Sequence, residues 1–590
     1  MLGRESSQQS FLDASWSAES LLEGEGFYEL LYREGPRLYP DEWFADCYDE
    51  STGRPSVPPG RMMKLLLLQT YEGLSDREAR ERMAFDLRWK AVLGMEVGEE
   101  PVAQATLVHF RARLQLHDKL EAAFERFLER AVEAGLLDPE EVQVVDSTAV
   151  WGRGAVEDTY NLIGSAVRKL LGVTADRRGV SAETVAEEVG LECTAPAEEG
   201  SLKGRAEIDW SEEEERRAFL NEVVGEARAL LRETAGEQAT DPEVREAAEL
   251  LARLLRQDLE PADDEPPAGE EPEGPERSRG SGPSSPESRE AEAGESRPEP
   301  DPPPELPDDP VLEAGRAVQI RRGVARNRVV SVHDPEMRHG HKSRKRRWDG
   351  YKTHVSVSAE SEFVTAVEVT PANQKDAGVA PQLMDQQREA GLAPDVQVGD
   401  MAYSPMELRA AARKRGTEIC ARVPPATAAG DRFSKEDFDL DLEAERATCP
   451  AGEVTDRWYG RKGEGSGYFA FDGATCAACE LREQCTGKDP EKMRETGYGR
   501  SVSVHARERL LQEARAKQET ERFQQLIGLR PVVERKIGHL RRLGLRQARY
   551  LGAAKTEFQA RATALVANLA RMAALLPAEP KPRTGWAVAA

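Results

Sequence analysis

Residues 142–148 are Val-Gln-Val-Val-Asp-Ser-Thr, a β-branched run that predicts a buried strand whose polar residues begin at its carboxyl end. Residues 395–400, Asp-Val-Gln-Val-Gly-Asp, repeat this arrangement. Open α/β sheets place their ligands beyond the carboxyl ends of their strands. The two runs therefore predict an α/β fold in which Asp146 and Asp400 face a common site.

A third carboxylate, Glu534, lies in a different setting. Residues 529–537, Leu-Arg-Pro-Val-Val-Glu-Arg-Lys-Ile, belong to a stretch of mostly helix-forming residues. A helix laid across the sheet would bring Glu534 to the two aspartates. The alternative is that any one acid among the 107 Asp and Glu residues is an ordinary solvated carboxylate.

Length and composition limit the class of protein. The 590 residues suffice for roughly three or four domains. The chain has no run of about 18 apolar residues, and its first residues, Met1–Ser7, lack the apolar segment of a signal peptide. We therefore expect a cytoplasmic protein without membrane contact. Seven cysteines without framework spacing indicate a reducing compartment.

The formal net charge of −26 argues at first sight against a nucleic-acid-binding protein. Nearly all of this excess lies in residues 181–310, whereas residues 311–360 and 501–590 are net basic. The segments before Tyr351 and around Glu534 can therefore still meet an anionic partner.

The acidic segment contains a predicted linker. Residues 261–310 are rich in Pro, Glu, Asp, Ser and Gly and nearly lack aliphatic residues, so we expect disorder there. Helical patterns precede the linker at Tyr160–Leu171, after the capping sequence Asp209-Trp210-Ser211, and at Glu243–Leu259. Together they predict a helical insertion after the first strand.

The N-terminal region, about 10–137, has mostly helical patterns. Within residues 61–79, an apolar helix is followed by Gly73 and by Ser75 with Glu78 three positions later, which predicts a capping box. Two helices joined by a short glycine turn have the outline of a helix-turn-helix DNA-binding motif. A purely structural helical hairpin would have the same pattern.

Further motifs follow one another in a defined order. The N-terminal blocks include residues 58–69, Pro-Pro-Gly-Arg-Met-Met-Lys-Leu-Leu-Leu-Leu-Gln, and residues 73–78, 85–89 and 106–114. The later blocks are Asp146-Ser147-Thr148, residues 331–338, Gly350-Tyr351-Lys352-Thr353-His354, residues 370–373 and Gly399-Asp400-Met401-Ala402-Tyr403. In this order they resemble the bacterial insertion-sequence DDE transposases with an InsH-like N-terminal domain, over about 10–150 and 320–570.

The resemblance implies an RNase H-like catalytic core, split by insertions and preceded by an all-α N-terminal domain. Its elements after Asp146 would be a hairpin of Tyr351–Ser358 and Phe363–Thr370, a helix at Asp376–Ala390, a strand at Asp395–Asp400, a helix at Met406–Arg415 and a strand at Thr417–Val423. The expected segments are a helical DNA-binding domain (1–137), the core (138–155 and 320–424), a helical acidic insertion (156–260), a disordered linker (261–319), a cysteine-containing insertion (425–500) and C-terminal catalytic helices (501–575).

The resemblance also implies the chemistry. Asp146, Asp400 and Glu534 would hold two Mg²⁺ or Mn²⁺ ions, with Asp146 bridging both. Water would first cut at the element ends, and the freed 3′-hydroxyl would then attack target DNA. The expected partners are double-stranded DNA, as terminal inverted repeats and as target, and further copies of the chain in a homodimer or larger assembly at the bacterial nucleoid.

One block departs from the family pattern. That pattern is Tyr, two residues, Arg, three residues, Glu, six residues and Lys, and it appears here as Ile527, Arg530, Glu534 and Arg541. The spacing is kept, but isoleucine replaces tyrosine and arginine replaces lysine. Arg530 and Arg541 remain candidates for binding DNA phosphates, although arginine binds as a fork rather than as a point charge.

Four cysteines form a second candidate site between Asp400 and Glu534. They are Cys449, Cys476, Cys479 and Cys485, which include one close Cys-X2-Cys pair. Four thiols of this kind are compatible with a tetrahedral structural Zn²⁺ site. The long gap between Cys449 and Cys476 leaves reduced thiols in a loop-rich insertion as the alternative.

A basic run forms a third candidate site. It consists of Lys342, Arg344, Lys345, Arg346 and Arg347 and is followed by Trp348. The cations would neutralise DNA phosphates and the indole would stack on a splayed base. A solvated loop is the alternative.

The predicted function is DNA transposition by metal-dependent phosphodiester cleavage and strand transfer. Two alternatives share these motifs: a catalytically silent, sequence-specific DNA-binding regulator derived from a transposase, and a nuclease that cuts without joining.

Overall fold

The computed structural model describes residues 1–5, 12–14, 21–24, 26–49, 53–196, 200–262, 309, 311–343, 345–428, 430–460 and 466–576. These residues divide into two compact units. The first unit comprises Met1–Arg153 and His339–Ala590, and the second comprises Gly154–Arg338.

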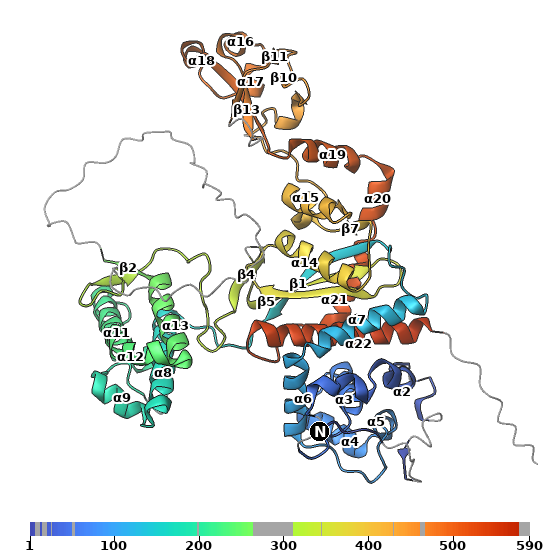
Figure 1. The fold of residues 1–590 in the computed structure, drawn as a ribbon. Helices are drawn as coiled ribbons and strands as arrows, with labels where there is room; N and C mark the ends of the chain where they lie inside the picture. Colours follow the sequence, from blue (N-terminus) through green and yellow to red (C-terminus); the bar gives the residue numbers. More distant parts are fainter. Residues whose placement is uncertain are drawn as a thin grey trace, which may run out of the picture. The chain divides into compact units, whose positions relative to one another are not determined.

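A six-stranded mixed sheet lies at the centre of the first unit (Figure 1). The strand order is β4-β5-β1-β7-β8, and β6 also pairs with β5. β1 runs antiparallel to β5 and β6 runs antiparallel to β5, whereas β7 is parallel to β1 and β8 is parallel to β7. The strands are β1 (Gln143–Trp151), β4 (Arg338–Ser343), β5 (Arg346–Ser358), β6 (Val364–Pro371), β7 (Val396–Val398) and β8 (Glu418–Cys420).

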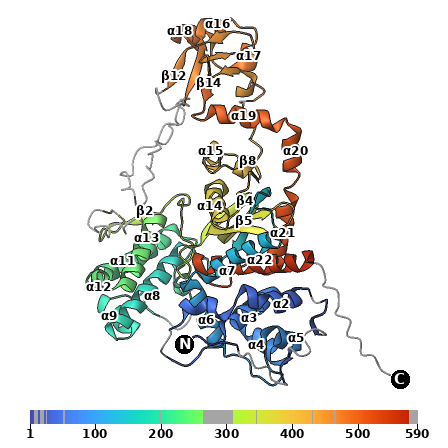
Figure 2. The ribbon, with the colours of Figure 1, turned by 45° about the vertical axis from the view of Figure 1, so that its right-hand side comes forward.

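Helices cover both faces of this sheet, which is why β1 carries buried valines on consecutive positions (Figures 1 and 2). α14 (Asp376–Glu389) and α15 (Met406–Lys414) form one layer, and α21 (Pro531–Arg542) and α22 (Ala553–Leu575) form the other. The predicted hairpin, the predicted helices after it and the predicted strands containing Val396 and Ile419 are confirmed, with ends that shift by a few residues.

The N-terminal part of the first unit is helical, as predicted. Ser75 caps α4, and Ser75 and Glu78 form both hydrogen bonds of the predicted capping box. Gly73, with φ of 71°, ends the preceding helix in the left-handed conformation that glycine adopts readily. The elements are α2 (Phe27–Leu38), the 3₁₀ helix η2 (Asp41–Cys47), α3 (Pro59–Glu72), α4 (Asp76–Phe85), α5 (Leu87–Leu93), α6 (Gln104–Leu116) and α7 (Lys119–Glu133).

The second unit is a helical domain with its own hydrophobic core, formed mainly by α8, α11 and α13. Its elements are α8 (Thr159–Arg178), α9 (Ala182–Val189), α10 (Leu202–Arg205), α11 (Glu213–Glu233), α12 (Ala235–Thr240), α13 (Pro242–Asp258), β2 (Leu259–Pro261) and β3 (Val318–Ile320). Ser211 does not cap α11, because its hydroxyl and amide both donate to Asp209, and Glu212 occupies the N-cap position instead.

The boundaries of the second unit differ from those predicted. It extends to Arg338 because Val329 and Val332 join its core and Gln257 hydrogen-bonds both backbone groups of Val329. Most of the predicted linker, residues 263–308 and 310, lies outside the described residues. Its two described ends include β2 and β3, which pair with each other.

The segment between β8 and α19 folds as a small β-rich part with two three-stranded sheets, β11-β10-β9 and β12-β13-β14. Its elements are η5 (Lys435–Asp437), β9 (Asp439–Asp441), β10 (Arg446–Thr448), β11 (Val454–Thr455), β12 (Trp458–Gly460), β13 (Gly467–Asp472), α16 (Gly473–Ala478), α17 (Arg482–Cys485), α18 (Pro490–Thr496) and β14 (Tyr498–Val504). α19 (Glu508–Gln518) and α20 (Glu521–Ile527) then lead to α21. No helix in the described part of the chain is both long and apolar enough to cross a membrane.

Candidate active site

Asp146 lies opposite Val355 of β5, in the middle of β1 and not at its carboxyl end as predicted, because the pairing with β5 continues to Trp151. Its neighbour Val145 packs in the cluster formed with residues of α14 and α15. Because successive side chains of a strand point to opposite faces, the Asp146 side chain points to the other face, where α21 packs against β1. The Ser147 amide donates a hydrogen bond of 2.7 Å to Asp146 Oδ1.

Asp400 follows β7, which pairs in parallel with β1 through Gln143 to Gln397 and Val144 to Val398. Continuing this register by two residues places Asp400 beside Asp146. The Ala402 amide donates to Asp400 Oδ1 at 2.8 Å, which makes Asp400 the N-cap of the 3₁₀ helix η4 (Met401–Tyr403). The two aspartates predicted to meet are thus brought together at neighbouring strands.

The electrostatics of Asp146 agree with this placement. Burial is the main reason that the pKa of Asp146 rises from 3.8 to about 6, and the negative charge of Asp400 raises this pKa further. The Ser147 amide and the cations Lys342 and Arg530 act in the opposite direction. The site is therefore an acidic pair bordered by two basic side chains.

Glu534 occupies the first turn of α21, on the helix that packs against β1 and β5. Its side chain is 59% exposed and lies 3.6 Å from Arg530, the same arginine whose charge acts on Asp146. Among the described residues, the three carboxylates do not form a group whose ligand oxygens all lie within 4.8 Å of one another. The structure therefore places Glu534 on the helix that packs against β1 and does not bring its carboxylate together with the aspartate pair.

The aspartate pair suits a hard divalent cation. Carboxylate oxygens are the ligands that Mg²⁺ and Mn²⁺ prefer, and a cation beside both groups would relieve the repulsion that raises the pKa of Asp146. Asp146 and Asp400 would hold such an ion, and Glu534 would join them after a change of its side-chain conformation.

A buried polar cluster on the α14 side of the sheet was not predicted. Lys352 Nζ lies 2.8 Å from Asp376 Oδ1, and His354, opposite Ser147 on β5, hydrogen-bonds Thr370 through Nε2 at 2.9 Å. Burial lowers the pKa of His354 to about 4, so the imidazole is neutral at neutral pH. Lys352 and His354 both lie in the motif 350–354. Their spacing of two residues is the sequence feature that could have indicated this polar cluster.

Tyr403 is a second residue to which the sequence assigned no role. It is fully buried, and a Cβ on Gly399 would lie 2.8 Å from its ring, so this glycine lets the tyrosine pack against the end of β7. The charges of Asp376, Asp146 and Asp400 act on its hydroxyl, which places Tyr403 next to the acidic pair.

The basic run forms the connection between β4 and β5. Lys342, Lys345, Arg346 and Arg347 are exposed, whereas Arg344 lies outside the described residues. Trp348 contradicts its predicted stacking on a base, because it is only 8% exposed and its Nε1 donates to the Tyr351 carbonyl at 2.9 Å. Alternation along β5 turns Trp348 inward while its neighbour Arg347 faces solvent.

The basic residues after Glu534 divide into two groups. Arg541 is exposed on α21, two turns beyond Glu534, and remains available to a DNA phosphate. Arg549 instead donates to the Leu74 carbonyl at 3.2 Å and ties the segment after α21 to the turn before α4. Not every arginine of this basic segment is therefore free for DNA.

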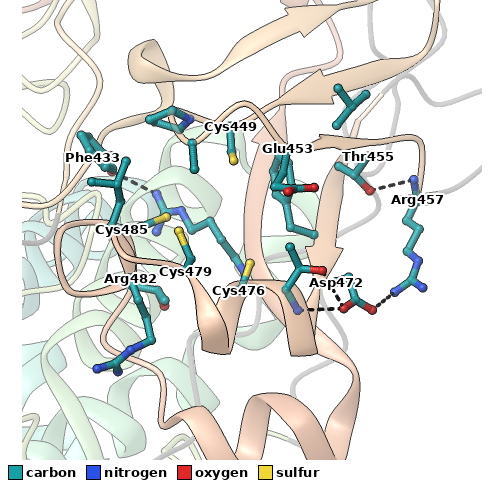
Figure 3. Close-up of a pocket in the computed structure, with 18 of the residues that line it drawn as sticks. Phe433, Cys449, Glu453, Thr455, Arg457, Asp472, Cys476, Cys479, Arg482 and Cys485 are labelled. Atoms are coloured by element: carbon teal, nitrogen blue, oxygen red, sulfur yellow. Dashed lines mark hydrogen bonds and ion pairs between the residues drawn. The ribbon is translucent and has the colours of Figure 1, made fainter.

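The four cysteines of the predicted zinc site line one pocket (Figure 3). Cys449 comes from the turn between β10 and β11, Cys476 from α16, Cys479 from the end of α16 and Cys485 from the end of α17. Their side chains point toward this pocket from separate elements. The structure thus gathers the four residues around one pocket without bringing their sulfurs within 4.8 Å of one another.

Comparison with known families identifies two domains. One family model, described as a transposase DDE domain, matches residues 448–573, and another, described as a transposase domain (DUF772), matches residues 34–113. The first match contains Glu534 and the four cysteines, and the second contains the α3–α4 hairpin. No curated protein and no solved structure matches the chain. The two matches confirm the resemblance stated from the sequence motifs.

Proposed function

We propose that this chain, an insertion-sequence DDE transposase by its two family matches, cuts DNA at element ends and joins the freed ends to a target. The observation that carries the proposal is the proximity of Asp146, within β1, to Asp400, which follows the parallel neighbouring strand β7, on a sheet against which the Glu534 helix packs. We assign double-stranded DNA as the substrate, with two or more copies of the chain acting on paired ends.

The sheet supports an RNase H-like core. Three antiparallel strands, β6, β5 and β1, continue into the parallel strands β7 and β8, with α14 between β6 and β7. This order agrees with the core that the sequence resemblance implies. The second unit then interrupts the core after its first strand.

Asp146, Asp400 and Glu534 would hold the divalent ions. Bound there, Mg²⁺ or Mn²⁺ supplies Lewis-acid stabilisation of the oxygens around the reacting phosphorus. Asp146 and Asp400 act as ligands in their ionised form, so below the raised pKa of Asp146, about 6, an ion would have to displace a proton from this carboxyl. The Ser147 and Ala402 amides fix the carboxylates by donating one hydrogen bond to each.

Basic side chains would position the DNA. Lys342 and Arg530 border the acidic pair, and Arg541 extends the positive charge along α21. The exposed hairpin residues Arg346 and Arg347 add sequence-independent attraction to phosphates. The α3–α4 hairpin is the element we assign to recognition of the element ends.

The decisive experiment incubates the protein with DNA carrying the element's own ends and Mg²⁺. Wild type should cut and transfer strands, whereas Asp146→Asn and Asp400→Asn should bind the ends and fail to cut. Asp385→Asn is the matched control, because this aspartate pairs with Arg415 and lies outside the site. Equal cutting by wild type and Asp146→Asn would refute the assignment. Binding without cutting by wild type would favour the silent regulator, and cutting without joining would favour the nuclease.

A further inference from the structure

The four thiols of the β-rich part approach one another from three different elements, although 36 sequence positions separate Cys449 from Cys485. Figure 3 shows their sulfur atoms around a common space. All seven cysteines of the chain are free, so no disulfide uses these thiols. Soft thiolate sets of this kind, including one Cys-X2-Cys pair, select Zn²⁺ over harder cations.

The backbone around Cys449 is shaped to present its thiol. The Cys449 amide donates to the Glu453 carbonyl at 2.8 Å, and the Gly452 amide donates to the Cys449 carbonyl at 2.8 Å. Gly452 has φ of 85°, a left-handed conformation that favours glycine. This closed turn at the tip of the β10–β11 hairpin holds Cys449 at the wall of the pocket.

Cys476 receives a hydrogen bond at its sulfur. The Arg500 amide donates to Cys476 Sγ at 3.5 Å, the kind of contact that stabilises a thiolate ligand. Gly499 makes this approach possible, since a Cβ on Gly499 would lie 2.4 Å from Cys476 Sγ. Strand β14 can therefore come close to the Cys476 sulfur at Gly499, which has no side chain.

Apart from β13 and β14, the strands of the β-rich part are short. Strands β9, β10 and β12 have three residues each and β11 has two. The core beneath them is a small cluster against which Cys449, Cys476 and Cys485 pack only partly buried. A metal ion held by these cysteines would add a link between α16, α17 and the β10–β11 turn that this core does not supply.

Ordinary packing of reduced thiols is the competing explanation. The four sulfurs do not form a group within 4.8 Å of one another among the described residues, so an ion would have to draw them inward. Among the described residues, the groups whose ligand atoms do lie within 4.8 Å of one another are Asp46, Cys47 and His117, and Cys193, Glu222 and Glu226. Lys119 already neutralises Asp46 at 2.8 Å, and the Glu226 carboxylate accepts the amides of residues 192–194, so neither group is free to act as a site.

We propose that Cys449, Cys476, Cys479 and Cys485 bind one structural Zn²⁺ ion that fixes the β10–β11 turn, α16 and α17 to one another. Binding would form four Zn–S bonds and release the thiol protons to solvent, with no change of oxidation state. Arg500 and Arg482, which also line the pocket, would offset the negative charge of the four thiolates. This proposal is independent of the proposed transposase activity.

The test measures zinc in the purified full-length chain after dialysis against metal-free buffer. Wild type should contain one zinc per chain by elemental analysis, and Cys476→Ser and Cys479→Ser should each lose it. Cys193→Ser is the matched control. Cys193 belongs to one of the compact groups in the second unit and lies outside the proposed zinc site, so this variant should retain the zinc.

A second measurement protects the test against variants that fail to fold. Wild type refolded with Co²⁺ should show the visible bands of tetrahedral thiolate coordination, and addition of Zn²⁺ should remove them. Chelation should speed hydrogen exchange in residues 446–504 while leaving β1 and β5 unchanged. Each of four results would overturn the proposal. Wild type could lack zinc or hold iron in its place, both serine variants could retain zinc, or Cys193→Ser could lose it.

Discussion

Asp146→Asn should stabilise the metal-free protein while abolishing its proposed activity. Burial and the charge of Asp400 raise the pKa of Asp146 from 3.8 to about 6, so the folded state holds the ionised carboxylate at a cost. That shift corresponds to about 3 kcal/mol, and the partial exposure of the side chain reduces the expected gain to about 2–3 kcal/mol. The asparagine keeps an oxygen acceptor for the Ser147 amide, so the hydrogen bond at 2.7 Å is retained.

The pH dependence fixes the sign of this effect. Because the folded-state pKa lies above the ordinary value, the cost is absent below 3.8, grows as pH rises, and is complete above about 6. Asp146→Asn should therefore gain about 2–3 kcal/mol at pH 8 and about half of this at pH 5. Mg²⁺ should stabilise wild type and leave the variant unchanged.

The assay is hydrogen exchange by mass spectrometry on peptides of β1 and β5, in buffer containing a chelator. It reports the opening free energy of this pair of strands without requiring the two units of the chain to unfold together. Asp385→Asn, whose carboxylate pairs with Arg415, should show no such gain. A variant no more stable than wild type at pH 8, or equally stabilised at pH 5 and pH 8, would refute the account of Asp146.

Three other substitutions test the surroundings of the site. Trp348→Ala should destabilise the protein by about 3–5 kcal/mol in urea unfolding, because its indole is 8% exposed and hydrogen-bonded. Arg347→Ala should leave stability unchanged and reduce the slope of log DNA affinity against log salt by about one, as measured by fluorescence anisotropy. Glu368→Gln should stabilise by about 1–3 kcal/mol at pH 9 and by little at pH 5, because burial and Glu557 raise the pKa of Glu368 to about 7. An equal gain at both pH values would contradict this reason.

The strands of the sheet could be predicted because the residues within each strand indicate it. The β-branched runs around Val144 and Val398 end at acidic residues, and Gly73 and Ser75 mark a helix end and a helix start by their own chemistry. Contacts within a few residues decide these features. Asp146 and Asp400 could be assigned to one site because their strands pair in parallel, although β1 continues to Trp151 and Asp146 therefore lies within its strand rather than at the end.

The remaining features depend on distant partners. Trp348 follows a basic run, and only the β4–β5 pairing shows that it turns into the core next to Gly340. The second unit reaches Arg338 because Val329 bonds to Gln257, 72 positions earlier in the chain. Lys352, in the middle of β5, meets Asp376 at the start of α14, a contact that neither residue's neighbours predict.

The net charge of −26 is compatible with the proposed action on DNA. Nearly all of the acidic excess lies in residues 181–310, whereas residues 311–360 and 501–590 are net basic. A phosphodiester approaching Asp146 and Asp400 would meet two like charges, and without compensation it would be repelled. Lys342 and Arg530 already supply two positive charges at this border, as their effect on the pKa of Asp146 shows. Arg530 also holds Glu534 at 3.6 Å, so a DNA phosphate that attracts Arg530 would release Glu534 toward the aspartates. Under the proposed function, binding of substrate would then help Glu534 to join the two aspartates.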